Sequence, residues 1–221
     1  MNSARSGHAH GDRGIQPPST LPGVEGATIN RDLSQFLTPA RLAEDVVAWS
    51  GAKAGDYVCE PSAGRGALVK PLLMLGCDVD AWEIDPGNIP ALGALKKHAP
   101  GFRGVIPCDF LTCTESCSPD TYSLAVMNPP YEDNQDVRFI ERALGCSERV
   151  VGIFQSRILH SKGRAEFWRH HDIRRMAILS QRPRFGGDHS AKTDFVVLEV
   201  LRRQSARLQG EATPTAMEWW S

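Results

Sequence analysis

The segment VMNPPYED, Val126–Asp133, places an amide and a phenol directly after an apolar run. Proline has no N–H for a sheet ladder and does not fit a helix interior, so Pro129 and Pro130 end regular structure abruptly. We therefore expect Asn128 and Tyr131 to lie in a rigid, extended segment at the end of a buried strand. Held there, the Asn128 side-chain oxygen and the Pro129 carbonyl can accept hydrogen bonds from an amine, and the Tyr131 ring offers a flat face for stacking.

Three acids follow three consecutive predicted strands. Glu60 stands in CEPSAGRGAL, before Gly64 and Gly66, Glu83 lies 23 residues later in WEID, and Asp109 follows in CDFL. The glycines permit a tight turn and let a ligand approach the backbone, and ligands of open α/β sheets bind beyond the carboxyl ends of the strands. Glu83 is placed to accept hydrogen bonds from ribose hydroxyls, and Asp109 to read an adenine amino group. The pattern predicts a nucleotide-like cofactor.

Strand-like and helix-like segments alternate along the chain. Thr38 followed by Pro39 predicts a helix start, with the hydroxyl as N-cap, and Gly51 predicts its end. Further helices are predicted at 67–75, 88–98, 136–144 and 163–171, and strands at 56–61, 79–85, 104–110, 123–128, 149–155, 174–180 and 194–201. This alternation predicts an α/β fold, a seven-stranded, mostly parallel sheet with helices on both faces. The last two strands have no obvious helix between them, so the last strand should be antiparallel.

Length and composition predict a single folded domain at residues 29–203 of the 221-residue chain. Residues 1–28 read as a disordered leader and residues 204–221 as a flexible tail. The sequence has no run of about 18 apolar residues and no secretory signal, which favours a cytoplasmic protein without a membrane partner. The six cysteines include no C-x-x-C pair, so we expect reduced, structural thiols and no metal.

Charge is distributed unevenly along the chain. Residues 138–207 hold 15 Lys and Arg against 7 Asp and Glu, while the remainder holds 10 against 19. Excess positive charge is typical of proteins that bind polyanions, so nucleic acid is the expected partner.

The series QFLTPARLA, EPSAGRGAL, WEIDP, CDFL and NPPY, in this order, resembles the S-adenosylmethionine-dependent amino-methyltransferases, and within them the N6-adenine DNA methyltransferases. The resemblance covers about residues 30–203. It implies a Rossmann-like class I methyltransferase fold, S-adenosylmethionine as cofactor and DNA as partner. This chain shows no separate target-recognition domain, so DNA contact is expected from the domain itself.

The resemblance also implies a role for each matching residue. The cofactor's methionine end is expected near Phe36, Thr38, Pro39, Glu60, Ala63 and Gly64, its ribose on Glu83, and its adenine near Ile84, Asp109 and Phe110. Asn128, Pro129, Pro130 and Tyr131 form the catalytic tetrad, and Tyr131 and Phe185 are expected to hold the target base between them.

The expected reaction is methylation of the N6 amino group of adenine in DNA, on a base flipped out of the helix. Acceptors at Asn128 and Pro129 would restore the lone pair of a nitrogen that is conjugated to the purine ring. Methylation of an RNA base and methylation of a protein glutamine amide use similar chemistry and remain alternatives. A nucleic-acid-binding module without activity is a further alternative.

Overall fold

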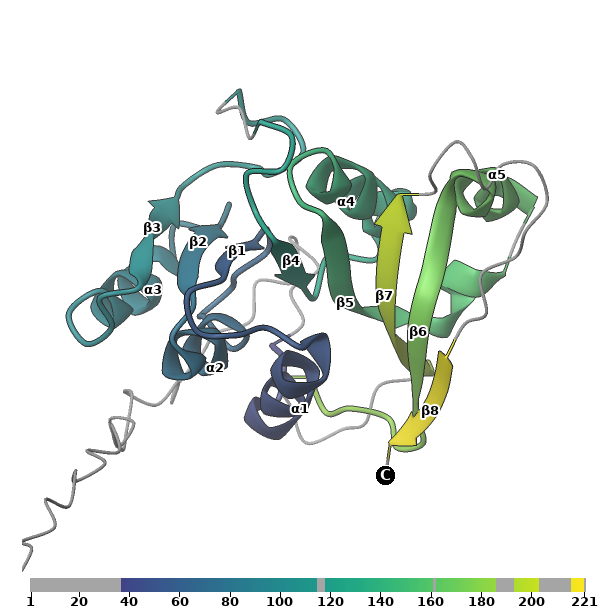
Figure 1. Cartoon of the computed structure of the whole chain (residues 1–221), viewed down its shortest axis with the longest axis horizontal. Helices are drawn as coiled ribbons and strands as arrows, with labels where there is room; N and C mark the ends of the chain where they lie inside the picture. Colours follow the sequence, from purple (N-terminus) through teal and green to yellow (C-terminus); the bar gives the residue numbers. More distant parts are fainter. Residues whose placement is uncertain (1–36, 115–117, 161, 186–192, 203–215, 221) are drawn as a thin grey trace, which may run out of the picture.

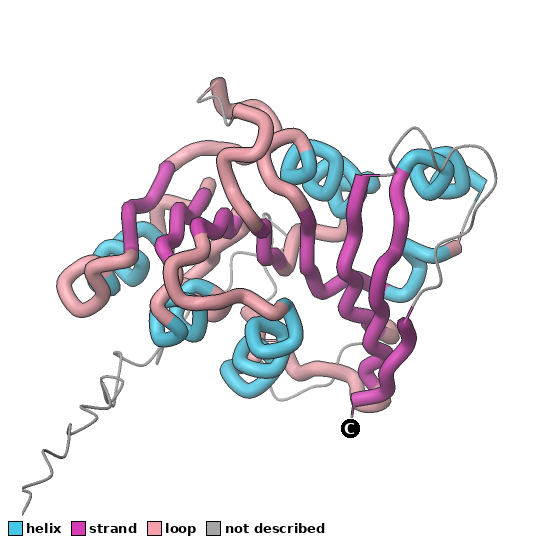
Figure 2. The backbone as a smooth tube through the Cα atoms, viewed as in Figure 1, coloured by secondary structure: helices cyan, strands magenta, loops and turns pink. Residues whose placement is uncertain are grey.

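The structure is a computed structural model, and it describes residues 37–114, 118–160, 162–185, 193–202 and 216–220. Eight strands form one sheet in the order β3-β2-β1-β4-β5-β7-β6-β8 (Figures 1 and 2). Strand β7 runs antiparallel to both of its neighbours, β5 and β6, and the other pairs are parallel. The strands are β1 Tyr57–Glu60, β2 Asp78–Trp82, β3 Phe102–Ile106, β4 Leu124–Met127, β5 Arg149–Gln155, β6 His171–Leu179, β7 Phe195–Arg202 and β8 Ala216–Trp220.

Helices cover both faces of this sheet (Figure 1). On one face, α1 Ala40–Ser50, α2 Val69–Leu75 and α3 Ile89–Leu95 bury an apolar cluster against the sheet, with Val46, Leu72 and Leu92 at its centre. On the other face, α4 Gln135–Leu144 and α5 Lys162–His170 contribute Ile140 and Phe167 to a second cluster. The predicted α/β fold class, including the antiparallel strand, is confirmed, although the sheet has eight strands in the described residues and not the predicted seven.

The first helix begins one residue later than predicted. Pro39 is its N-cap, no side chain caps it, and Gly51 ends it in the left-handed conformation at φ 68°. The Thr38 hydroxyl instead accepts a hydrogen bond from the side chain of Asn128. A residue that the sequence assigned to helix capping therefore contacts the predicted catalytic amide.

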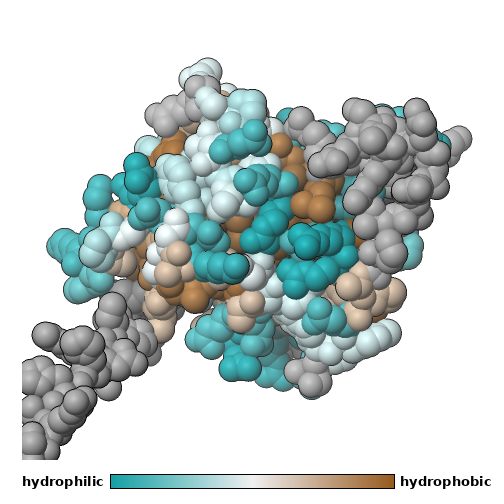
Figure 3. Space-filling model, viewed as in Figure 1, coloured by the Kyte–Doolittle hydropathy of each residue, from teal (hydrophilic) through white to brown (hydrophobic). Residues whose placement is uncertain are grey.

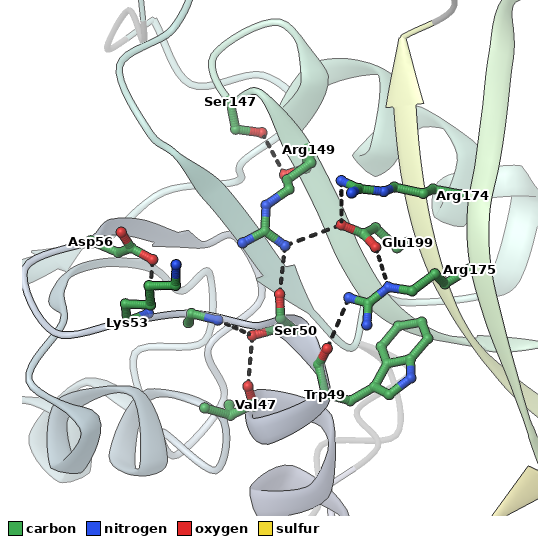
Figure 4. A network of polar contacts seen from close by, with 11 residues as sticks. Val47, Trp49, Ser50, Lys53, Asp56, Ser147, Arg149, Arg174, Arg175 and Glu199 are labelled. Atoms are coloured by element: carbon green, nitrogen blue, oxygen red, sulfur yellow. Dashed lines mark hydrogen bonds and ion pairs between the residues drawn. The ribbon is translucent and has the colours of Figure 1, made fainter. Parts of the chain in front are cut away.

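A buried carboxylate fastens the other end of α1 to the sheet (Figure 4). Glu199 in β7 lies 3.2 Å from Arg149 and 2.5 Å from Arg175. The same two guanidinium groups donate to the carbonyls of Ser50 and Trp49, at 2.5 and 2.9 Å. The last carbonyls of a helix have no partner within it, so these bonds both satisfy the backbone and fix the helix on the sheet.

The structure differs from the sequence interpretation at the C-terminal segment. Ala216–Trp220 is not a tail but forms β8, which pairs with β6 in parallel. Its inner side chains reach α1: Glu218 accepts a hydrogen bond from the Trp49 indole at 2.8 Å, and Trp220 packs edge-on against that ring at 5.8 Å. These long-range contacts explain why a turn-rich composition did not reveal the strand. The predicted leader lies outside the described residues.

A second difference concerns the cysteines. Cys108 and Cys113 are joined by a disulfide, with their Cα atoms 5.9 Å apart. The loop after β3 turns back within five residues, which brings the pair within disulfide range. Cys59, Cys77 and Cys146 are buried thiols, as expected.

The described surface mixes hydrophilic residues with small separate apolar patches on the face shown in Figure 3. No helix within the described ranges has the length and apolar character to cross a membrane.

Candidate active site

A cavity of about 530 Å³ opens where β1, β2, β3 and β4 end. Its size is typical of a site for a small organic ligand. It gathers residues from all five sequence motifs, the first of which contributes Leu37. Among those predicted for the site, it is lined by Gly64, Glu83, Ile84, Asp109, Phe110, Asn128 and Pro130.

The glycine loop forms one wall of this cavity. Gly64 and Gly66 adopt positive φ angles of 53° and 84°, which residues with a Cβ rarely adopt. At Gly66 an added Cβ would also lie 2.9 Å from a terminal methyl of Leu95 in α3, so a side chain here would require that leucine to shift. The Ala63 N–H donates to the Trp82 carbonyl at 2.9 Å and ties the loop to β2.

Glu83 connects the glycine loop to the end of β2. Its carboxylate accepts the Gly64 N–H at 2.6 Å and the Asp85 N–H at 2.7 Å, while the side chain lines the cavity. Burial raises the pKa of Glu83, and the hydrogen bonds act in the opposite direction. Ile84 beside it is 53% exposed, an apolar surface that a flat ring could cover.

The loop after β3 closes the far side of the cavity. The Asp109 carboxylate accepts the Leu111 N–H at 2.9 Å and the Thr112 hydroxyl at 3.1 Å, which holds the loop in shape. Phe110 is buried and packs edge-on against Trp82, with ring centroids 5.4 Å apart. The Cys108–Cys113 disulfide spans this loop.

A smaller cavity of about 30 Å³ adjoins the larger one, since Leu37, Ser62, Gly64 and Asn128 line both. Thr38, Glu60, Ala63 and Gly64 line it, as does Arg65. Glu60 is 1% exposed and accepts hydrogen bonds from the Ser62 N–H and hydroxyl at 3.2 and 3.3 Å. Burial raises the pKa of Glu60 well above its ordinary value, and the charge of Glu83 adds to this effect. This cavity therefore joins a buried acid with a cation.

Arg65 was missed by the sequence interpretation, although it stands between the two glycines of the loop. Arg138 in α4 was missed as well, and it lines the larger cavity from the exposed face of that helix. Helix periodicity gave no reason to separate Arg138 from other solvated arginines.

Asn128 lies where the two cavities meet, because it lines both of them. It follows β4 directly and is 9% exposed. Its Nδ2 donates to the Thr38 hydroxyl at 2.9 Å, and its Oδ1 accepts a hydrogen bond from the Tyr131 hydroxyl. The predicted catalytic amide is thus held at a fixed point between the two parts of the site.

Tyr131 and Phe185 lie elsewhere than expected. Tyr131 is 1% exposed and lines neither of these two cavities; its ring packs edge-on against Phe195 at 5.6 Å. Phe185 is partly buried and packs against the other side of the same residue at 4.9 Å. The two rings therefore both pack against Phe195, and the buried Tyr131 ring does not present an open stacking face. Burial of the phenol, which the double proline did not reveal, is the reason.

The remaining predicted residues are placed as follows. Pro39 precedes α1, where its carbonyl accepts the Ala43 N–H at 3.0 Å, and it lines neither cavity. Pro129 is buried next to Asn128 and also lines neither cavity. Phe36 lies outside the described residues. Within the described ranges, no group of three His, Cys, Asp or Glu side chains is arranged to hold a metal ion.

Two arginines hold the chain just after the N-P-P-Y tetrad. Arg157 donates to the Tyr131 carbonyl at 2.5 Å. Arg164 forms a buried ion pair with Asp136 at 2.9 Å, and it also reaches Asn134, whose φ is 57°. The backbone that follows the tetrad is therefore held in place.

The sheet order, with an antiparallel strand between β5 and β6, and the glycine loop after β1 define the class I methyltransferase fold. A putative RNA methyltransferase from Pyrococcus horikoshii superposes with a TM-score of 0.63 at 20% identity, covering 84% of this chain and 94% of that one. The M protein of the type I restriction enzyme EcoKI gives a TM-score of 0.63 at 14% identity, covering 82% of this chain and 47% of that one.

Sequence comparison identifies relatives with more specific names. No family model matches the chain. The mitochondrial dimethyladenosine transferase 2 of Homo sapiens is 28% identical over 151 residues, 64% of this chain and 37% of the relative. The ribosomal RNA small subunit methyltransferase A of Rhizobium etli (strain CIAT 652) is 32% identical over 121 residues, 53% of this chain and 44% of the relative. The chain spans less than half the length of these relatives.

Proposed function

We propose that this protein transfers a methyl group from S-adenosylmethionine to the N6 amino group of an adenine in nucleic acid, with RNA as the first substrate to test. The observation that carries the proposal is the position of Asn128 at the junction of the two cavities. In S-adenosylmethionine the sulfonium joins the adenosine half to the methionine half. An amide at the junction therefore lies beside the reacting methyl group.

The cofactor is S-adenosylmethionine, and the chemistry of the two cavities fits it. The larger cavity offers Glu83 to ribose hydroxyls, exposed Ile84 to the adenine ring, and Asp109 to the adenine edge. The smaller cavity offers the Glu60 carboxylate and the Arg65 guanidinium, a pair that matches the ammonium and carboxylate of an amino acid. When bound, the cofactor supplies an electrophilic methyl group.

The work of the protein is then to position an amine and restore its lone pair. The N6 nitrogen of adenine is a weak nucleophile because its lone pair is delocalised into the ring. A hydrogen bond from one N6 proton to Asn128 Oδ1 would favour a pyramidal nitrogen; the Pro129 carbonyl, expected from the motif as a second acceptor, belongs to a residue that lines neither cavity. The lone pair then bonds the methyl carbon as the carbon–sulfur bond breaks, and one proton leaves to water. Positioning and fixed dipoles supply this effect without a titrating base.

The choice of RNA is supported by the sequence relatives. One is named a dimethyladenosine transferase and the other a ribosomal RNA methyltransferase. They favour the RNA alternative over the DNA reading that the sequence motifs suggested, and give no support to a protein glutamine substrate. DNA adenine stays the second candidate because the Q-F-L-T-P and E-P-x-x-G-x-G elements resemble DNA enzymes.

Nucleoside mass spectrometry tests the proposal directly. Purified protein with S-adenosylmethionine is incubated separately with unmodified ribosomal RNA, single-stranded DNA and duplex DNA, and each polymer is digested to nucleosides. We expect N6-methylated or N6,N6-dimethylated adenosine from RNA, and none with Asn128→Ala. Methylation at any other atom, or full activity in Asn128→Ala, contradicts the proposed site. Methyl-deoxyadenosine from DNA alone would select the second candidate.

A further inference from the structure

The Asn128 amide is held at both ends by hydroxyl groups. Its Nδ2 donates to Thr38 Oγ1 at 2.9 Å, and its Oδ1 accepts from the Tyr131 hydroxyl. We propose that Thr38 and Tyr131 are positioning residues that set the orientation of the Asn128 amide for the incoming amine. The inference rests on the proposed function, since it concerns the same amide.

Orientation matters because the two ends of an amide have opposite hydrogen-bonding character. The oxygen only accepts and the NH₂ group only donates, yet the two groups have nearly the same shape. A half-turn of the side chain would point a donor at an amine that needs an acceptor. The Thr38 and Tyr131 hydroxyls each bond one end of the amide and hold it in place before an amine binds. A carbonyl oxygen has two lone pairs, so the Tyr131 bond leaves Oδ1 able to accept a second proton.

The surroundings of Tyr131 suit it to this task. Its ring is 1% exposed and packed against Phe195, and its hydroxyl also lies 3.2 Å from the Ile153 carbonyl, a second acceptor, so the hydroxyl has little freedom to move. Burial, with a smaller effect from the charge of Asp136, raises the pKa of Tyr131 well above its ordinary value, so the phenol keeps the proton that it donates. A buried hydroxyl beside an amide explains the position of Tyr131 better than base stacking does.

Thr38 is placed with similar precision. It lies two residues before α1, and the far end of that helix is fixed by Arg149 and Arg175 to the buried Glu199. The sequence resemblance assigned Thr38 to the cofactor's methionine end, where it does line the smaller cavity. The two roles predict different defects: a contact with the cofactor changes its affinity, whereas positioning of Asn128 changes the rate of transfer with cofactor bound.

Four variants separate these roles: Thr38→Val, Thr38→Ser, Tyr131→Phe and Asn128→Ala. Cofactor affinity is measured by calorimetry. The rate of single-turnover methyl transfer is measured at saturating S-adenosylmethionine, with the polymer that the wild-type protein methylates as substrate. Thr38→Val and Tyr131→Phe should each slow transfer about 10- to 100-fold, as expected when a partly buried polar group loses its partner. Cofactor affinity should change less than about threefold, and Thr38→Ser, which keeps the hydroxyl, should restore the rate.

Matched controls exclude a general effect of losing a hydroxyl. Thr121→Val removes a bond to the Ser118 carbonyl on an exposed loop, and Tyr57→Phe removes one to Asp80 at the start of β1. Both should transfer at the wild-type rate. An unchanged rate in Thr38→Val or Tyr131→Phe would overturn the role of that residue. So would a defect in cofactor affinity alone, or Thr38→Ser as slow as Thr38→Val.

A readout independent of activity keeps the inference testable whatever the substrate. In ¹⁵N spectra the Asn128 side-chain NH₂ pair is identified by its loss in Asn128→Ala. Thr38→Val and Tyr131→Phe should shift this pair, and the two controls should not. An unmoved pair contradicts the inference even if methylation is seen. Absence of adenine methylation by the wild type would refute the proposed function, while the spectra would still decide whether the hydroxyls hold the amide.

Discussion

Replacing Glu199 with glutamine removes the negative charge around which three arginines gather, while keeping the shape of the side chain. The carboxylate is 2% exposed, and the side chains of its close partners Arg149 and Arg175 are 18% and 29% exposed. Arg174, 3.8 Å away, is 59% exposed and adds little. The substitution therefore leaves two partly buried guanidinium groups facing a neutral amide.

The magnitude follows from these contacts. A hydrogen bond to a charged group contributes about 1.5–3 kcal/mol. Two such bonds are weakened rather than abolished, and both arginines keep some access to water, so we expect a loss of about 2–4 kcal/mol in the free energy of unfolding. For a chain of this size, that lowers the melting temperature by about 4–16 °C.

Urea unfolding and thermal melts of Glu199→Gln measure this loss. Glu166→Gln is a matched control, because Glu166 pairs with Arg169 and His170 on the exposed face of α5. It should unfold like the wild type. A loss below about 1 kcal/mol in Glu199→Gln would refute the view that this carboxylate fixes α1, since surface ion pairs contribute up to about that much.

Three further predictions concern the cofactor site. Glu60 has a raised pKa, so the folded protein binds its proton more tightly than the unfolded chain does, and stability falls as the pH rises from the ordinary glutamate range through that raised value. Glu60→Gln should therefore have a higher melting temperature than the wild type at neutral pH, and this difference should disappear towards pH 4. The variant should also bind S-adenosylmethionine more weakly. An equal difference in melting temperature at both pH values contradicts this prediction. Arg65→Gln should lower the affinity for S-adenosylmethionine about 10-fold or more in calorimetry, as loss of a charged hydrogen bond implies. It should leave the affinity for decarboxylated S-adenosylmethionine unchanged. Arg138→Gln should affect the binding of the two ligands equally. Dithiothreitol should weaken cofactor binding, because it frees the loop that the Cys108–Cys113 disulfide closes. A variant with serine at both positions should bind the cofactor more weakly than the wild type, and reductant should not change its affinity. Equal affinity of the wild type with and without reductant argues against this prediction.

Much of the fold was predictable because its signals are local. Strand β5 was predicted at residues 149–155 and has those bounds, since a run of apolar and β-branched residues has few alternatives. Pro71 is the third residue of α2, in the first turn, where its missing N–H needs no partner. Strand β8 was not predicted because the contacts that stabilise it are made with α1 and β6, more than 35 residues away in the sequence.

The candidate site was likewise predictable only in its local features. The glycine loop and the acids at strand ends were found because strand ends of a parallel sheet converge on one edge. The roles of Thr38 and Tyr131 were not, because sequence shows a hydroxyl or a ring but not its partner. The excess positive charge of residues 138–207 was also assigned too fully to a nucleic-acid surface. Several arginines of this segment bind groups inside the protein instead: Arg149 and Arg157 donate hydrogen bonds to backbone carbonyls, and Arg164 forms an ion pair with a carboxylate.

The division of the site into two cavities has a consequence for turnover. The contacts proposed for the cofactor lie at its two ends, on Glu60 and Arg65 in one cavity and on Glu83, Ile84 and Asp109 in the other. Transfer of the methyl group changes neither end. The spent cofactor, S-adenosylhomocysteine, would keep the whole set and lose only the positive charge on sulfur. On this arrangement the proposed methyltransferase would be subject to strong product inhibition, and its rate in a cell would follow the ratio of fresh to spent cofactor.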